Sequence, residues 1–176
     1  MPNRIESTLD VILSRIVERL KFVIPGADDQ TCYLADDPDE LRSGLLKTAP
    51  AEVCFLVCPA PGGQFDPAFW AGGGEFTIEV NTVVTVTVHK AIELADQQGR
   101  GRELLTAANR GLFSQYMPLV MTALAGHDLT NTDGNWILSK ALEPLDYNWD
   151  REPKRRTSSI QIGFGVNWQQ KFTAAV

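Results

Sequence analysis

The stretch FTIEVNTVVTVTVH, residues 76–89, alternates between apolar and polar side chains almost without a break. An alternation with a period of two is typical of a β-strand that has one buried and one solvated face. The apolar parity comprises Phe76, Ile78, Val80, Val84, Val86 and Val88, and the polar parity comprises Thr77, Glu79, Asn81, Thr85, Thr87 and His89. At about 3.3 Å per residue this strand would span roughly 45 Å, whereas a usual strand spans about 17–20 Å.

Two further strand patterns lie near the C-terminus. Residues 136–149, WILSKALEPLDYNW, are strand-like, and Pro144 within them predicts an edge strand or a bulge. Residues 158–169, SSIQIGFGVNWQ, alternate cleanly, and the short polar loop DREPKRR before them predicts an antiparallel hairpin. The inward set is Ile160, Ile162, Phe164, Val166 and Trp168, and the outward set is Gln161, Gly163, Gly165 and Asn167.

Two segments carry the apolar stripe of an amphipathic helix. Residues 3–24 form the first, which Pro25-Gly26 ends, and a second helix ends at Gly126. Pro118 lies in the middle of the second helix and predicts a kink or a restart there. The stripes are Ile5, Leu9, Ile12, Ile16, Leu20 and Val23 in the first helix, and Leu112, Tyr116, Val120 and Leu124 in the second.

The segment between the first helix and the long strand contains a short apolar run and then an irregular stretch. Residues 52–58, EVCFLVC, indicate a buried strand, and residues 59–74, PAPGGQFDPAFWAGGG, indicate a long loop because prolines and glycines interrupt every regular pattern. The loop carries the aromatic side chains Phe65, Phe69 and Trp70. Two interpretations stay open: a connection tucked over the core, or an arm that docks its aromatics on a neighbour.

An acidic cluster precedes this run, at Asp36, Asp37, Asp39 and Glu40. Asp37 before Pro38, with Glu40 three residues later, is typical of a helix start with an N-cap aspartate and proline at the first position. A calcium loop spaces its acids by alternation and contains a turn glycine, and this cluster has neither. The cluster therefore predicts a short helix rather than a cation site.

Together these elements predict one α+β domain over residues 1–176, with a Pro/Gly-rich loop insertion at 59–74. The sheet is expected to be mainly antiparallel, with helices packed on one face, one long strand and a C-terminal hairpin. Its other face is expected to be polar.

Composition, charge and cysteine content indicate which classes of protein this chain can belong to. The chain is 44% hydrophobic and 22% charged, which is typical of soluble globular proteins. We expect no membrane span and no secretion signal, and hence synthesis in a cytoplasm. The formal net charge of −6 disfavours a general nucleic-acid-binding surface. Three cysteines, Cys32, Cys54 and Cys58, are expected to be reduced and to pack as small apolar side chains rather than to bind zinc.

The sequence offers few groups for catalysis. It contains neither a G-x-S-x-G nor an H-E-x-x-H motif. His127-Asp128 near Asp133 could be a base and its orienting group, but LAGHDLTNTDG is more typical of a helix exit and a turn. His89 is expected to be solvated at a strand end. We therefore expect no enzymatic activity, no cofactor and no metal.

The layout resembles the tail terminator proteins of long-tailed bacteriophages, the family of the lambda tail terminator. The resemblance follows the order of elements from about residue 5 to residue 169. It is carried by an N-terminal helix, the run EVCFLVC, the strand FTIEVNTVVTVTVH, a helix ending TALAGHDL, the segment WILSKALEPLDYNWD and the final strand IQIGFGVNW. The chain departs from the family in its greater length and in the elaborated loop 59–74.

The resemblance implies a homohexameric ring that caps the tail tube, ends tube polymerisation and presents a surface to the neck. The partners would be copies of the same chain, the major tail tube protein and a neck or head-completion protein, at the tail–neck junction of the virion. DNA would pass through the lumen without specific binding, and the acidic charge agrees with such passage. The family has no cofactor and performs no chemistry.

The excess length of the long strand is then interpreted as a surface for assembly. The expected interface residues, chosen by pattern alone, are Phe65, Phe69 and Trp70 in the loop, Thr77, Glu79, Asn81, Thr85 and Thr87 on the long strand, and Lys154, Arg155 and Arg156 in the hairpin loop. For these three basic residues a solvated turn is the alternative interpretation. Three other functions stay open for the whole chain: a head-completion or neck connector ring, a small ligand-binding domain or enzyme, and an adaptor of bacterial secretion or tail-like particles.

Overall fold

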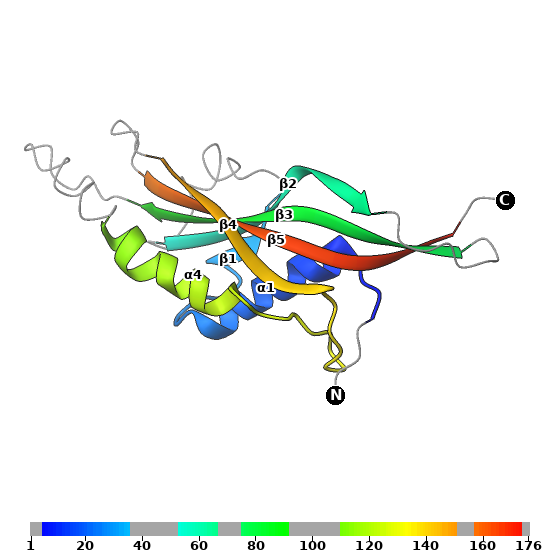
Figure 1. Ribbon diagram of the computed structural model, residues 1–176. Helices are drawn as coiled ribbons and strands as arrows, with labels where there is room; N and C mark the ends of the chain where they lie inside the picture. Colours follow the sequence, from blue (N-terminus) through cyan, green and yellow to red (C-terminus); the bar gives the residue numbers. More distant parts are fainter. Residues whose placement is uncertain (1–4, 36–52, 67–74, 92–109, 151–156, 174–176) are drawn as a thin grey trace, which may run out of the picture.

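The computed structural model describes residues 5–35, 53–66, 75–91, 110–150 and 157–173 (Figure 1). The described elements are the helices α1 (Leu9–Val23), η2 (Leu112–Tyr116) and α4 (Met117–Leu124) and five strands. The strands are β1 (Cys32–Leu34), β2 (Val53–Asp66), β3 (Glu75–Ala91), β4 (Lys140–Asp150) and β5 (Thr157–Thr173).

The five strands form one sheet in the order β1-β2-β3-β5-β4. The pairs β2–β3, β3–β5 and β4–β5 are antiparallel, and only the three-residue strand β1 runs parallel to its neighbour β2. Helices beside a mainly antiparallel sheet make an α+β fold, as the sequence predicts. The long strand is also confirmed, since β3 has 17 residues, and so is the C-terminal hairpin of β4 and β5.

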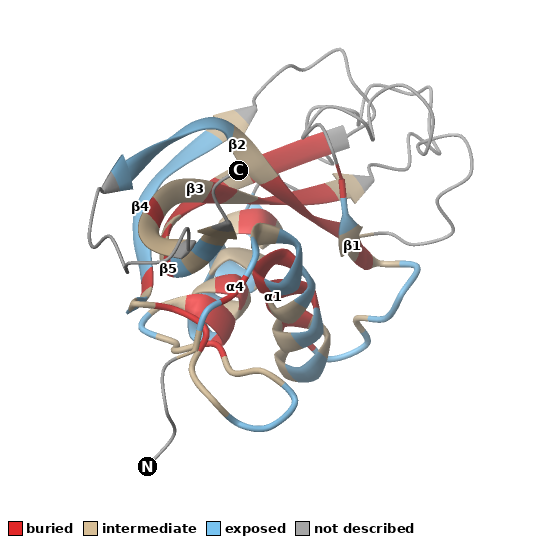
Figure 2. Ribbon diagram, turned by 90° about the vertical axis from the view of Figure 1, so that its right-hand side faces the viewer, coloured by how far each residue is buried: buried red, intermediate tan, exposed pale blue. Residues whose placement is uncertain are grey.

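The apolar parity of β3 faces the core. Val84, Val86 and Val88 are fully buried, and they share one cluster with residues of α1, of α4 and of β5. Figure 2 shows α1 and α4 side by side on the same side of the sheet. Both helices contribute buried residues to the cluster that they share with the strands. We call this side of the sheet the helix face. The inward set predicted on β5, from Ile160 to Trp168, is no more than 2% exposed.

The opposite side carries the other parity, and we call it the polar face. On β3 it comprises Thr77, Glu79, Asn81, Val83, Thr85, Thr87 and His89. The register places these residues, in the same order, beside Lys171, Gln169, Asn167, Gly165, Gly163, Gln161 and Ser159 of β5. One strand pattern therefore sets both faces, because side chains alternate across a strand and antiparallel partners share a face.

Helix α1 begins at Leu9 rather than near residue 3. The preceding residues are not helical because their backbone pairs elsewhere: the Ser7 N–H donates to Gln169 O at 2.9 Å, and the Ile5 N–H donates to Trp136 O at 2.9 Å. Ile5 still packs against the core cluster, so its place in the apolar stripe is retained without helix. The helix ends where Pro25-Gly26 predicts, with Gly26 at φ 78° in the following turn.

Pro118 disturbs its helix as predicted. The backbone forms the π-helical turn η2 over residues 112–116, and Pro118 then lies in the first turn of α4. A proline inside an α-helix clashes with the carbonyl four residues before it and lacks an N–H, so a wider turn before Pro118 is a local solution. Leu112, Val120 and Leu124 of the predicted stripe are fully buried, and Gly126 follows the helix at φ 71°.

The prediction of a loop at residues 59–74 is wrong for its first half, residues 59–66. Strand β2 continues through residues 59–66, PAPGGQFD, and stays paired with β3 as far as Asp66. Three residues between Pro59 and Gly63 face only Val83 between Val84 and Thr82, so a bulge of two extra residues absorbs the irregular composition. Residues 67–74 lie outside the described residues.

Strand β4 confirms the expectation from Pro144. It is the last strand of the sheet, and its register shifts between Lys140 and Glu143 and again between Pro144 and Asp146. Residues 136–139, expected to be part of this strand, precede it, and Trp136 forms an isolated bridge with Thr130. The short helix expected after Asp37 and the hairpin loop at 151–156 lie outside the described residues.

Candidate assembly interface

The polar face forms transverse rows that cross four strands. The register places Gln64 of β2, Asn81 of β3, Asn167 of β5 and Lys140 of β4 next to one another in one such row. The neighbouring row places Val83 beside Gly165 and Glu143. The first row therefore has uncharged amides, Asn81 and Asn167, at its centre. At the β4 end, the two rows carry the ionisable side chains of Lys140 and Glu143.

The residues predicted on β3 divide into two groups. Thr77, Glu79, Asn81 and Thr85 are partly exposed, and Thr77 Oγ1 donates to Glu6 Oε1 at 2.9 Å. Thr87 is fully buried within the single chain. The first four remain candidates for contact with a neighbour, and Thr87 does not, because another subunit cannot reach its side chain without a rearrangement.

The polar face is buried toward the C-terminal end of β3, which the sequence did not predict. Leu56, Cys54 and Ala35 form a second apolar cluster there, and Cys54 lies opposite His89. His89 is only 5% exposed, so the expectation of a solvated histidine is wrong. Alternation on one strand shows which side chains share a face but does not show whether that face is covered.

All three cysteines are free thiols and buried, as predicted. Burial raises the pKa of the Cys32 thiol to about 12 and also raises the pKa of the Cys54 thiol. Both thiols are therefore poor nucleophiles at neutral pH, because the reactive form is the thiolate.

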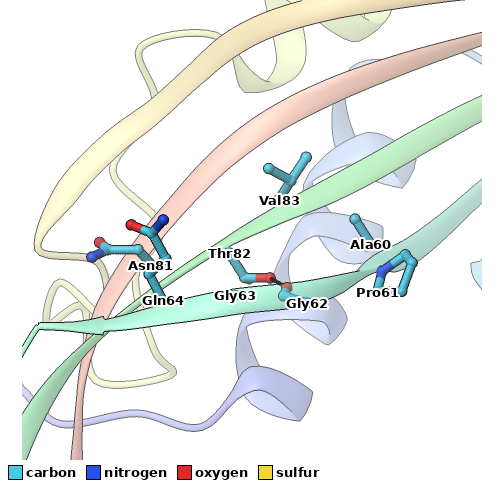
Figure 3. A pocket seen from close by; sticks show the side chains of 8 residues that line it. All are labelled: Ala60, Pro61, Gly62, Gly63, Gln64, Asn81, Thr82 and Val83. Atoms are coloured by element: carbon cyan, nitrogen blue, oxygen red, sulfur yellow. Dashed lines mark hydrogen bonds between the residues drawn. The ribbon is translucent and has the colours of Figure 1, made fainter.

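A shallow depression of about 420 Å³ lies at the bulge between β2 and β3. Figure 3 shows Gln64 and Asn81 side by side at one end of it, and Thr82 Oγ1 donating to the Gly62 carbonyl at 2.9 Å. The lining is completed by Ala60, Pro61, Gly63 and Val83, so none of the lining side chains is titratable. The depression offers hydrogen-bonding groups but no acid or base.

One stretch of backbone is exposed at each of the two opposite edges of the sheet. Strand β1 covers β2 only at Phe55–Val57, and residues 61–65 beyond it are all exposed; we call them the distal β2 segment. Strand β4 is the last strand of the described sheet, and its residues 143–148 are all exposed; we call them the β4 edge. Exposed strand edges are templates for pairing with another chain.

Each exposed edge carries an aromatic side chain on the helix face. Phe65 in the distal β2 segment lies opposite Val80 and is 68% exposed. Tyr147 on the β4 edge lies opposite Ile162 and is 56% exposed. Phe113 of η2 packs edge-on against Tyr147 at 5.7 Å and against Trp149 at 4.6 Å between ring centroids, so the π-helical turn holds an aromatic cluster beside β4.

The residues considered as a catalytic group lie in a turn instead. The His127 N–H donates to Leu124 O at 3.0 Å, closing the exit of α4, and the His127 carbonyl accepts from Leu142 N at 3.1 Å. Asn131 Oδ1 accepts from the backbone N–H groups of Asp133 and Asn135 and organises the following loop. Burial, and secondarily the Arg19 cation, lower the pKa of His127, while Asp128 opposes this shift.

Within the described parts of the chain, no group of three or more His, Cys, Asp or Glu residues is placed to hold a metal ion. Among the described helices, none has both the length and the apolar character needed to cross a membrane. Of the other predicted interface residues, Phe69, Trp70, Lys154, Arg155 and Arg156 lie outside the described residues.

The structure adds Phe113, Tyr147 and Trp149 to the candidate interface. Tyr147 and Trp149 are two residues apart in YNW, so the pattern of β4 indicates a shared face. It does not indicate that this face meets Phe113, because that contact depends on the π-helical turn.

No protein-family model matches the sequence, and a search of curated proteins finds no match.

Proposed function

We propose that this protein is a structural subunit that assembles with copies of itself into a ring, and that the ring caps a bacteriophage tail tube. One observation carries the proposal: β3 and β5 are paired over 17 residues, a length of about 55 Å, while full burial is confined to part of that length. Toward the N-terminal end of β3, Phe76, Thr77, Ile78 and Glu79 are all only partly buried. This end of the sheet offers extended backbone and side chains to a neighbour.

The sequence supports the tail terminator form of this proposal through the order of its elements. Such a ring would interact with copies of itself, with the major tail tube protein and with a neck protein. DNA would move through its lumen, and a chain with a net charge of −6 favours such movement because like charge gives phosphates no binding site.

A head-completion or neck connector ring would use the same kind of surface, so the two are separated by their partners. A ligand-binding domain or enzyme would need ionisable groups that converge in a pocket. The depression at the β2 bulge is lined by amide, hydroxyl, apolar and glycine residues, so it does not favour that alternative.

Purified tail tubes test the proposal. The protein is added to growing tubes, and tube length and end occupancy are measured by negative-stain electron microscopy. We expect ring-shaped density at one end of each tube and no further growth. Binding to heads or connectors with no effect on tubes would favour the neck protein, and free tubes that keep growing would contradict the terminator.

A further inference from the structure

We propose that copies of this chain join head to tail, with the β4 edge of one copy pairing with the distal β2 segment of the next in antiparallel orientation. This inference rests on the proposed function, because it names the interface through which the ring would close. It starts from the position of the two edges: β4 ends the described sheet on one side, and the distal β2 segment is exposed on the other.

Strand directions in the sheet allow this join without turning a subunit over. Strand β2 is antiparallel to β3, β3 to β5 and β5 to β4, so β2 and β4 run in opposite directions. When a second copy is placed beside the first with the same face forward, its β2 is therefore antiparallel to the first copy's β4. The helix faces then stay on one side of the joined sheets, and the polar faces stay on the other.

The side chains on the two edges match in this arrangement. Phe65 and Tyr147 are both exposed and both lie on the helix face, so the join brings Phe65 of one copy beside Tyr147 of the next. Cross-strand aromatic neighbours stabilise a sheet by roughly 0.2–1 kcal/mol per pair. Phe113 already packs against the rings of Tyr147 and Trp149 within one copy, so Phe65 of the neighbouring copy would join an existing aromatic cluster. On the polar face, Gln64 and Asn148 would be neighbours.

The prolines and bulges restrict the pairing to short segments. Pro61 lies in the β2 bulge, and Pro144 lies between the two register shifts of β4. Residues after each irregularity, from Gly63 and from Asp146, return to regular pairing. Such features protect an edge against indiscriminate association, so each edge leaves only a short regular segment for a specific partner.

Charge favours the head-to-tail join over a symmetric one. In a symmetric dimer of two β4 edges, the exposed carboxylates of Glu143 and Asp146 from both copies would gather around one axis. Like charges opposite each other destabilise strand pairing. The distal β2 segment, PGGQF, has no charged residue, and Asp66, the next residue of β2, is the one acidic residue that this register places opposite Asp146. The head-to-tail join therefore gathers fewer acidic residues than the symmetric join. A head-to-tail interface leaves each copy with one edge for the next copy, which produces a ring when the rotation closes.

A disulfide trap tests this join. In the variant Gln64→Cys/Asn148→Cys, the two positions within one copy lie three strand spacings apart across the sheet, about 14 Å, and also about 20 Å apart along the strands, which is too far for a disulfide. Both wild-type residues are exposed, and the three native thiols are buried. We expect mild oxidation to give a covalent ladder of multiples of the chain on a non-reducing gel.

Matched variants make the outcome specific. Gln64→Cys alone, Asn148→Cys alone and Ser14→Cys/Thr132→Cys, two exposed positions away from both edges, should give no ladder. A dimer from Asn148→Cys alone would overturn the inference in favour of the symmetric join. Assembly of the wild type, seen by light scattering, without a ladder from the double variant would overturn the inference and leave the ring intact. A wild type that neither assembles nor binds tubes would overturn the ring itself.

Truncation of one aromatic gives a second, independent test. Phe65→Ala should weaken self-association about tenfold, because well-packed aromatic anchors dominate interface energies. Phe22→Ala is the control, since Phe22 is 82% exposed on α1 and lies on neither edge. Equal association constants for wild type and Phe65→Ala would contradict the inference.

Discussion

Two glycines at neighbouring strand pairs differ in what a side chain would meet. A Cβ at Gly63 would lie 2.9 Å from the Asn81 backbone oxygen, and a Cβ at Gly163 would lie 2.5 Å from Asp146 Oδ1. A backbone carbonyl in a paired strand cannot move away without breaking the ladder, whereas the side chain of exposed Asp146 can rotate. The cost of adding a side chain therefore depends more on whether the contacted atom can move than on the contact distance.

We expect Gly63→Ala to destabilise the protein by about 1–3 kcal/mol, the usual range for forcing an extra group into a packed site. Gly163→Ala should cost less than about 1 kcal/mol. Chemical denaturation of both variants measures the difference. Equal stability of wild type and Gly63→Ala would show that the β2 bulge is not packed as described.

Thr87 and Thr82 form a second contrasting pair on β3. Thr87 Oγ1 is buried without a hydrogen-bond partner among the described residues, and Thr82 Oγ1 donates to the Gly62 carbonyl. Replacing a buried, unsatisfied hydroxyl by a methyl group removes a desolvation cost. Thr87→Val should therefore stabilise the protein by about 1 kcal/mol, and Thr82→Val should destabilise it by a similar amount. Denaturation midpoints measure both, and a loss of stability in Thr87→Val would contradict this description.

His127 gives the fold a pH dependence with a definite sign. Burial lowers its pKa in the folded chain below the value of about 6.5 in the unfolded chain. Unfolding therefore takes up a proton, so the free energy of unfolding decreases as pH falls through 6.5 toward the folded pKa. We expect His127→Gln to lose less stability than the wild type between pH 7.5 and pH 5.5. Parallel pH profiles for the two proteins would contradict the assignment.

At the scale of the elements, the long strands differ in stability along their length. Val84, Val86 and Val88 of β3 are fully buried, whereas residues 76–79 are only partly buried. Local opening is easiest where few apolar contacts hold a backbone in place. In the isolated chain, amides of residues 84–88 should exchange with deuterium far more slowly than those of residues 76–79.

Assembly should change this pattern at the exposed edges. Hydrogen-exchange mass spectrometry of the assembled protein should show new protection in the distal β2 segment and on the β4 edge. Protection that is confined to other surfaces, such as the outer side of α1, would contradict the proposed join.

The sequence predicts the strands themselves better than their neighbours. Alternation identified the inward residues of β3 and β5, and Pro144 and Pro118 identified an edge strand and a disturbed helix. The continuation of β2 through residues 59–66 was missed because prolines and glycines indicate a loop, while pairing with β3 and a two-residue bulge hold the strand together. The buried position of His89 and the contact of Phe113 with Tyr147 depend on residues distant in sequence, which local patterns do not report.

At the scale of the whole molecule, the described residues form a five-stranded sheet with helices beside it and an exposed stretch at each of its two edges, the β4 edge and the distal β2 segment. Each stretch carries an aromatic residue on the same face. Subunits of this kind can join head to tail in a series, each copy pairing with the next. When the series closes into a ring, neither of the two exposed stretches is left unpaired in any copy.

The mass of the assembled particle tests this account most directly. Size-exclusion chromatography with light scattering, performed on the protein alone and on complexes released from tail tubes, should reveal one discrete species. For a hexamer of the 19.4 kDa chain its mass is about 116 kDa. A mass of 19.4 kDa under all these conditions, or a dimer that grows no further, would contradict a ring built through the two exposed edges.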